Sequence, residues 1–198
     1  MASAERISPL SGWAARFAGA THADFSIREI PFATQINVRV AENHRAALGF
    51  KAPVKANTWT GDPANSTLWL GPDELLLIAP AGKNDALCTS LRQALAGTHH
   101  SVVDVSASRT IFEISGNDAR TVLAKGCPLD LHASVFGPGQ CAQSLLAKSQ
   151  VIFQCIEARP VIRLLVRNSF AAYVAEWPLD AAAEQRASRA AGRLGFAP

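Results

Sequence analysis

The segment from Asp104 to Arg109 holds several groups that could bind a ligand or a partner. It reads Asp-Val-Ser-Ala-Ser-Arg, so a carboxylate, two hydroxyls and a guanidinium lie between two β-branched runs. A carboxylate and a guanidinium form strong, directional hydrogen bonds. We therefore expect Asp104 and Arg109 to pair across a loop, either shaping the turn or presenting polar groups, including Ser106, to a ligand or partner.

The cysteines and histidines lack the spacing of a metal site. The four cysteines stand far apart, at Cys88, Cys127, Cys141 and Cys155. Two thiolates on one zinc ion are usually two to four residues apart, and no two histidines here are placed to share one helical face. Asp130 and His132 form a candidate polar pair beside a predicted helix end, where a local structural hydrogen bond is the common outcome.

The sequence motifs that hold phosphates or expose a nucleophile are missing. No GxGxxG turn follows a predicted strand, and neither a GxxxxGK[ST] loop nor a GxSxG elbow occurs. We therefore expect the isolated chain to carry no nucleotide or flavin and to lack a hydrolase nucleophile.

Composition narrows the class of protein further. Of 198 residues, 48% are hydrophobic, 18% are charged and 7% are aromatic, and the net charge of +3 is scattered rather than gathered in runs. A nucleic-acid partner is therefore not expected. Apolar stretches are much shorter than the ~20 residues of a membrane span, and the first ten residues do not resemble a secretory signal. These features predict a cytoplasmic protein with reduced thiols and no membrane partner.

The periodicity of apolar residues predicts the elements that position these groups. Strands are expected at 34–40, 67–70, 75–78, 101–105, 110–114, 151–157 and 161–166. Helices are expected at 41–48, 84–97, 117–126, 169–177 and 180–189, with an irregular connection at 50–66.

Particular residues should begin and end these helices. Asn84, Asn117 and Ser169 are expected to cap helix starts, and Pro178 is expected to stop a helix whose apolar face begins at Phe170. Each half of the chain reads as strand, helix, two strands, helix. These elements predict an α+β body of two intimately packed subdomains with antiparallel or mixed sheets. Its expected divisions are an N-terminal extension at 1–29, a first subdomain at 30–98 and a second at 99–198.

Several segments resemble one known family. They include 102–110, which holds Asp104 and Arg109, and 115–120, which reads SGNDAR. Further matching segments are 69–74, 125–131, 141–147 and 164–171. Together, in this order, they resemble the gamma subunit of heterotetrameric sarcosine oxidase over roughly residues 30 to 184.

The resemblance implies a non-catalytic chain within an assembly of alpha, beta, gamma and delta subunits. That assembly oxidises sarcosine to glycine, producing hydrogen peroxide and, with tetrahydrofolate, 5,10-methylenetetrahydrofolate. FAD, FMN, NAD and tetrahydrofolate are expected on the partner subunits, and the alpha subunit is expected to be the main contact. Asp104, Ser106, Arg109 and Asp130 are then candidate interface or loop-shaping residues.

The gamma family is also similar to the folate-binding aminomethyltransferase fold. In those enzymes a strand after a Leu-Leu segment carries adjacent aspartates, and the matching positions here are Phe153 and Gln154. Neither side chain can act as a base or balance a developing positive charge. Glu157 is three positions along a strand from Gln154, on the opposite face, and is not expected to substitute. The alternative is a folate-binding or aminomethyl-transferring protein acting on its own.

Overall fold

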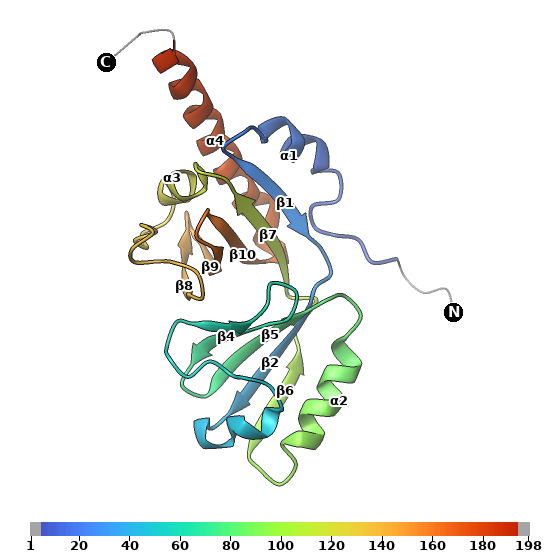
Figure 1. Cartoon of the computed structure of the whole chain (residues 1–198). Helices are drawn as coiled ribbons and strands as arrows, with labels where there is room; N and C mark the ends of the chain where they lie inside the picture. The colour runs from blue at the N-terminus through green and yellow to red at the C-terminus, as the bar shows by residue number, and fades with distance from the viewer. Residues whose placement is uncertain (1–4, 194–198) are drawn as a thin grey trace.

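The computed structural model describes residues 5–193, which fold into two sheets with helices on their outer faces (Figure 1). The strands are β1 (Ser26–Ile30), β2 (Thr34–Val40), β3 (Trp59–Gly61), β4 (Ser66–Gly71), β5 (Glu74–Ala79), β6 (His100–Asp104), β7 (Arg109–Ser115), β8 (Cys141–Leu146), β9 (Ser149–Glu157) and β10 (Val161–Arg167). The α-helices are α1 (Ala14–Ala20), α2 (Asn84–Ala94), α3 (Ala119–Ala124) and α4 (Ala171–Arg193). The 3-10 helices are η1 (Glu42–Leu48) and η2 (Asn168–Phe170).

The two sheets share one strand arrangement. The first has the order β3-β4-β5-β2-β6, and the second has the order β8-β9-β10-β7-β1. Each unit runs along the chain as a strand, a helix, a three-stranded meander and a second helix. The meander then returns beside the first strand of its unit. The repetition expected from the sequence is therefore present, with three strands rather than two between the helices.

Three apolar clusters hold the layers together. The first, which includes Phe112, lies between the second sheet and the helices α1, α3 and α4. The second, which includes Leu91, lies between the first sheet and α2. The third joins the two sheets through side chains such as Leu68, Ile152 and Leu165. Strand alternation explains this layering, because Ile152 faces the other sheet while its neighbours on β9 face the helices.

The strand predictions are largely confirmed, and every strand pairing in the described chain is antiparallel. The strands expected at 67–70 and 75–78 pair as a hairpin, with Leu68 opposite Leu76 on β4 and β5. β3 was not predicted, because it is only three residues long and lies in the Gly- and Pro-containing connection. β8 was not predicted either, because its Ala142-Gln143-Ser144 core carries little β-propensity.

The chain crosses between the two sheets at places that differ from the expected divisions. β1 pairs with β7 in the second sheet, although it lies within residues 1–29 for most of its length. β6 pairs with β2 in the first sheet, although it follows residue 98. The two sheets therefore exchange strands across both expected boundaries. The division into subdomains at 1–29, 30–98 and 99–198 stays a prediction.

The prediction that Pro178 ends a helix is wrong. α4 runs through Pro178 to Arg193. Pro178 cannot donate a backbone hydrogen bond, but Val174 and Ala175 before it and Ala181 and Ala182 after it all lie in the first apolar cluster. Packing on both sides of the proline therefore outweighs one missing hydrogen bond. No helix within residues 5–193 is long and apolar enough to span a bilayer.

The predicted capping residues do not cap their helices. The N-cap positions of α2 and α3 are Lys83 and Asp118, and neither has a side-chain cap hydrogen bond. Asn84 instead donates from Nδ2 to the Asp104 carboxylate, 3.0 Å away. Asn117 donates from Nδ2 to the Asp24 carboxylate. Ser169 lies in η2, which also has no side-chain cap. Asn84 and Asn117 therefore join separate segments rather than capping their own helices.

Candidate functional site

The segment at 105–108 is one of two places where the chain passes between the sheets, and Gln35 joins it to the other. The Gln35 backbone N–H donates to Ser106 Oγ at 2.9 Å, and the Val105 N–H donates to the Gln35 carbonyl at 2.8 Å. Gln35 Nε2 also donates to the Arg109 carbonyl at 2.8 Å. Gln35 is fully buried at the start of β2, close to the other crossing at 31–33. This set of bonds fixes the two crossings against each other.

Asp104 completes this turn, but it does not pair with Arg109 as expected. Its Oδ1 accepts hydrogen bonds from the Ser106 N–H at 2.9 Å and from Ser106 Oγ at 2.5 Å. Burial opposes ionisation of this carboxyl, but the Ser106 and Asn84 hydrogen bonds prevail and lower its pKa. No ion pair joins Asp104 to Arg109 within residues 5–193. The carboxylate already has three local donors, so it needs no guanidinium.

Asp130 forms a separate and local arrangement. Its Oδ1 accepts from the His132 backbone N–H at 2.8 Å, and the His132 ring nitrogen Nδ1 lies 2.8 Å from Ser134 Oγ. Both Asp130 and His132 are exposed. Arg120 holds the surrounding loop by donating to the Leu131 and Phe136 carbonyls. The local hydrogen bond expected here is therefore present, on the backbone of His132 rather than on its ring.

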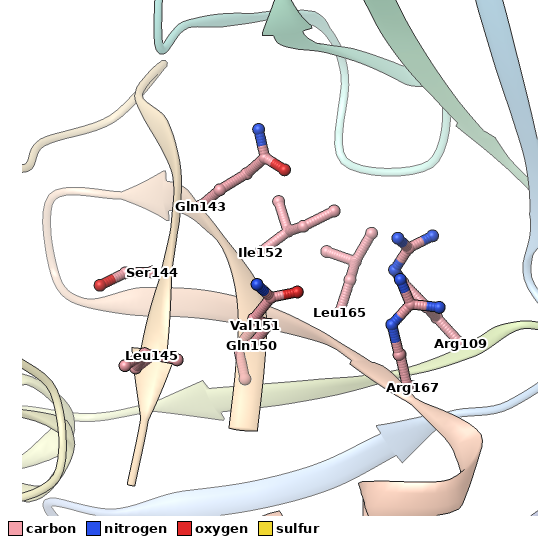
Figure 2. Close-up of a pocket in the computed structure, with 9 residues that line it drawn as sticks. All are labelled: Arg109, Gln143, Ser144, Leu145, Gln150, Val151, Ile152, Leu165 and Arg167. Atoms are coloured by element: carbon pink, nitrogen blue, oxygen red, sulfur yellow. The ribbon is translucent and has the colours of Figure 1, made fainter. Parts of the chain in front are cut away.

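A cavity of about 350 Å³ lies on the face of the second sheet that looks toward the first (Figure 2). Arg109 at the start of β7 and Arg167 at the end of β10 are direct cross-strand partners at one end of it. Ile152 and Leu165, also cross-strand partners, form part of its apolar floor. Burial, and then the charge of Arg167, lowers the pKa of the Arg109 guanidinium. The candidate Arg109 thus faces a second arginine and a cavity.

Positions 153 and 154 lie inside the protein. Phe153 is fully buried in the first apolar cluster, among the side chains beneath the helices. Gln154 is also fully buried, on the face of β9 toward the other sheet, where its Nε2 donates to Ser66 Oγ at 3.1 Å. Glu157 is exposed at the end of β9. None of these three residues lines the cavity beside Arg109.

The four cysteines are free, buried and weakly acidic. Burial raises the pKa of Cys88, Cys127 and Cys155, and raises that of Cys141 to about 12. The thiol form therefore dominates at neutral pH, and a thiol is a much weaker nucleophile than a thiolate. These side chains serve packing.

The aromatic residues predicted to form the inner face of the C-terminal helix remain on the surface. Phe170, Tyr173 and Trp177 are 45%, 40% and 39% exposed, while Val174 between them is fully buried. Tyr173 and Trp177 are four residues apart on α4, so they share one face of this helix, and Phe170 precedes them by one turn. η2 and α4 therefore bury a narrow stripe of Val and Ala and leave a partly exposed aromatic row beside it.

The two-sheet antiparallel α+β body defines the class of protein as one with the aminomethyltransferase fold. Its similarity to the glycine cleavage system aminomethyltransferase T from Bartonella henselae has a TM-score of 0.63 at 16% identity, covering 81% of this chain and 46% of that one. At this identity the likeness concerns the fold alone.

Within that class, the chain belongs to the sarcosine oxidase, gamma subunit family, which its residues 34–184 match. Curated sarcosine oxidase gamma subunits from Arthrobacter sp. and Corynebacterium sp. (strain P-1) are 36% and 35% identical over 173 residues, or 84% of each chain. A chain of the heterotetrameric sarcosine oxidase from Corynebacterium sp. U-96, solved with pyrrole 2-carboxylate, is 34% identical. It has a TM-score of 0.82 and covers 90% of this chain and 95% of its own. The expected family and fold are confirmed.

Sequence reasoning found one part of this site and missed the rest. It selected Asp104, Ser106 and Arg109 from their residue types, and the first two do shape the crossing. It missed Gln35 and Arg167, because they meet the 104–109 segment across 58 to 74 residues of chain, Gln35 through tertiary hydrogen bonds and Arg167 through strand pairing. One signal in the sequence could have indicated the arginine pair: Arg109 directly precedes one predicted strand and Arg167 directly follows another.

Proposed function

We propose that this chain is a non-catalytic gamma subunit of a heterotetrameric sarcosine oxidase, and that its role is structural. The complex would oxidise sarcosine to glycine, with hydrogen peroxide as a product and, when tetrahydrofolate is present, 5,10-methylenetetrahydrofolate. The observation that carries this proposal is the aromatic row formed by Phe170 at the end of η2 and by Tyr173 and Trp177 on α4. Aromatic side chains gathered on one exposed helix face are typical of a surface that a partner covers.

The interior at positions 153 and 154 supports a structural role. A folate-dependent transfer needs a carboxylate beside the reacting nitrogen, in a place that a substrate reaches. Phe153 fills an apolar core and Gln154 bonds to Ser66 between the sheets, so both positions contribute to stability. The carboxylates of Asp104 and Asp130 accept hydrogen bonds from neighbouring residues, which favours loop-shaping roles for both.

We propose the alpha subunit as the main partner of the aromatic row, with the beta and delta subunits completing the assembly. FAD, FMN, NAD and tetrahydrofolate would be held by these partners. Purified without them, the chain should show no flavin absorbance near 450 nm, as the missing dinucleotide motif predicts. We propose the cytoplasm as its compartment, since its four cysteines are free thiols.

The test co-expresses all four subunits with the double variant Tyr173→Ser/Trp177→Ser. Removing two aromatic anchors should lower the fraction of the chain that co-elutes with the alpha subunit by at least about tenfold. Val54→Ser is the matched control, because Val54 is 73% exposed and lies in the loop before β3. It should assemble as the unchanged chain does. A photo-crosslinking residue at position 177 identifies the subunit that lies against α4.

Sarcosine turnover per bound flavin separates a structural role from a catalytic one. Complex that does assemble with the double variant should turn over at the normal rate, because the chemistry belongs to other subunits. Unchanged assembly would exclude the aromatic row as the contact surface. Normal assembly with a collapsed turnover would mean that this chain takes part in the reaction.

A further inference from the structure

Two rows of side chains from neighbouring strands form the floor and one end of the cavity in Figure 2. Gln143, Ile152 and Leu165 are consecutive cross-strand neighbours on β8, β9 and β10. Two residues further along the strands, on the same face, come Leu145 opposite Gln150, and Arg167 opposite Arg109. Every one of these side chains therefore faces the cavity because of sheet register alone. Ser144 and Val151 also line the cavity, but by strand alternation their side chains lie on the opposite face of the sheet.

The two arginines form a positive group without an acidic partner. Neither Arg109 nor Arg167 forms an ion pair within residues 5–193, and no lining residue is acidic. Glu74 acts on Arg109 electrostatically, but its carboxylate oxygens accept from Asn37 at 2.7 Å and from Arg39 at 2.8 Å. Like charges directly opposite on adjacent strands are destabilising. Partial burial of Arg109 increases that cost, so an anion between the two guanidinium groups would relieve it.

The remaining lining limits what kind of anion fits. The apolar part of the lining is the half-exposed Leu145 together with the edges of the buried Ile152 and Leu165, and the amides of Gln143 and Gln150 lie along it. Gln143 Nε2 already donates to the Leu70 carbonyl at 2.9 Å, which fixes this amide between the two sheets. A cavity of about 350 Å³ is within the range of small-molecule sites. A bare inorganic ion would leave the apolar floor uncovered.

We propose that this cavity is a binding site for a small organic carboxylate. The carboxylate group lies between the Arg109 and Arg167 guanidinium groups, which suit its planar, two-oxygen geometry. The body of the ligand lies against Leu145 and the edges of Ile152 and Leu165. This inference does not rest on the proposed subunit function, because the cavity and the aromatic row of α4 are on opposite faces of the second sheet.

The experiment uses the purified full-length chain and three probes: benzoate, its neutral analogue benzamide, and inorganic phosphate. Benzoate should bind with a Kd on the order of 1 mM or tighter, and benzamide and phosphate should each bind at least about tenfold more weakly. The Nε–Hε resonances of Arg109 and Arg167 should shift during the benzoate titration, which locates the site directly. Calorimetry gives the affinity.

Charge-matched variants separate this cavity from general attraction to a basic protein. Arg109→Gln and Arg167→Gln should each weaken benzoate binding at least about tenfold. Arg159→Gln removes the same charge from the exposed turn at the other end of β10, and should change the affinity less than about twofold. Because Arg167 is exposed, its variant should fold even if Arg109→Gln does not, and circular dichroism checks both.

Three results would overturn the proposal. They are an absence of benzoate binding to the unchanged chain, equal binding of benzoate and benzamide, and equal losses in all three arginine variants. If the unchanged chain binds no benzoate but Arg109→Gln and Arg167→Gln lose assembly with the other subunits, the pair holds an acidic side chain of a partner and is not a ligand site.

Discussion

Gln154 on β9 donates from Nε2 to Ser66 Oγ on β4, 3.1 Å away, and so joins the second sheet to the first through buried side chains. The Gln154 Oε1 atom is buried without a hydrogen-bond partner in the described part of the chain. Only one of the two polar groups of this buried amide has a hydrogen-bond partner. A charged side chain at this position would also lack a partner, and burying it would cost free energy. The position that the resemblance matches to an aminomethyltransferase carboxylate is therefore a contact between sheets in this chain.

Gln154→Asp should destabilise the chain by roughly 3–5 kcal/mol, because it leaves an unpaired carboxylate between the sheets. The double change Phe153→Asp/Gln154→Asp should prevent folding and create neither tetrahydrofolate binding nor transfer activity. Gln154→Met is the matched control, since it keeps the length and removes the unpartnered oxygen, and should cost less than about 1.5 kcal/mol. Urea denaturation measures all three. A stable double variant that binds tetrahydrofolate would show that a working pocket remains.

Glu113 on β7 should make stability depend on pH. Its carboxylate bonds to Arg28 and to Arg163, with the Arg163 Nε 2.9 Å away. Burial alone would raise its pKa, but these two arginines prevail and the pKa is lowered. Its stabilisation is therefore fully present above the unfolded carboxyl pKa of about 4.3, and is lost as the pH falls through the lower folded value.

Glu113→Gln should accordingly cost about 1–3 kcal/mol at pH 7 and progressively less below about pH 4. The comparison is with Glu42→Gln, because Glu42 is exposed and forms no ion pair within the described residues. Denaturation curves from pH 3 to 7 give both differences. If the cost of Glu113→Gln does not change with pH, the lost stability comes from altered packing and not from the lost ion pairs of Glu113.

Gly116 should tolerate no side chain. Its φ is +105°, and a Cβ built there lies 2.3 Å from the Asp24 carbonyl oxygen. Gly116→Ala should therefore destabilise the chain by more than about 2 kcal/mol. Gly82→Ala tests the strain alone, because Gly82 has a φ of +78° with open space around it, and should cost about 1 kcal/mol. Equal costs would contradict the close approach of the turn before β1 to the loop before α3.

Ser106 should hold the crossing between the sheets. Ser106→Ala removes the acceptor for the buried Gln35 N–H and should cost about 1–3 kcal/mol. Ser108→Ala, in the same loop, should cost less than about 1 kcal/mol, because the Val105 carbonyl that its Oγ contacts also accepts the Ser108 N–H. Thermal unfolding measures both. Hydrogen exchange at Gln35 should quicken only in Ser106→Ala, and an unchanged rate would argue against this contact.

Local patterns in the sequence determined much of the fold. The alternation at 34–40 and the runs at 151–157 and 161–166 identify strands. Apolar alternation and β-branched side chains are signals that extend over only a few neighbouring residues, so the sequence contains them directly. Ala119, Val122 and Leu123 recur at helical spacing within the helix expected at 117–126, and all three are buried. The ordered segments from 69 to 171 also identified the family.

Tertiary structure alone decided which segments meet. Pro178 lies inside a helix because Val174 and Ala181 are both buried against the same core, a fact that no local signal contains. Asp104 turns to Ser106 and to Asn84 at the start of α2, whereas Arg109 lies opposite Arg167 because β7 pairs with β10. The contact between the two arginines depends on the register of strands whose residues are more than fifty positions apart. The sequence does not show how close such distant residues lie in space.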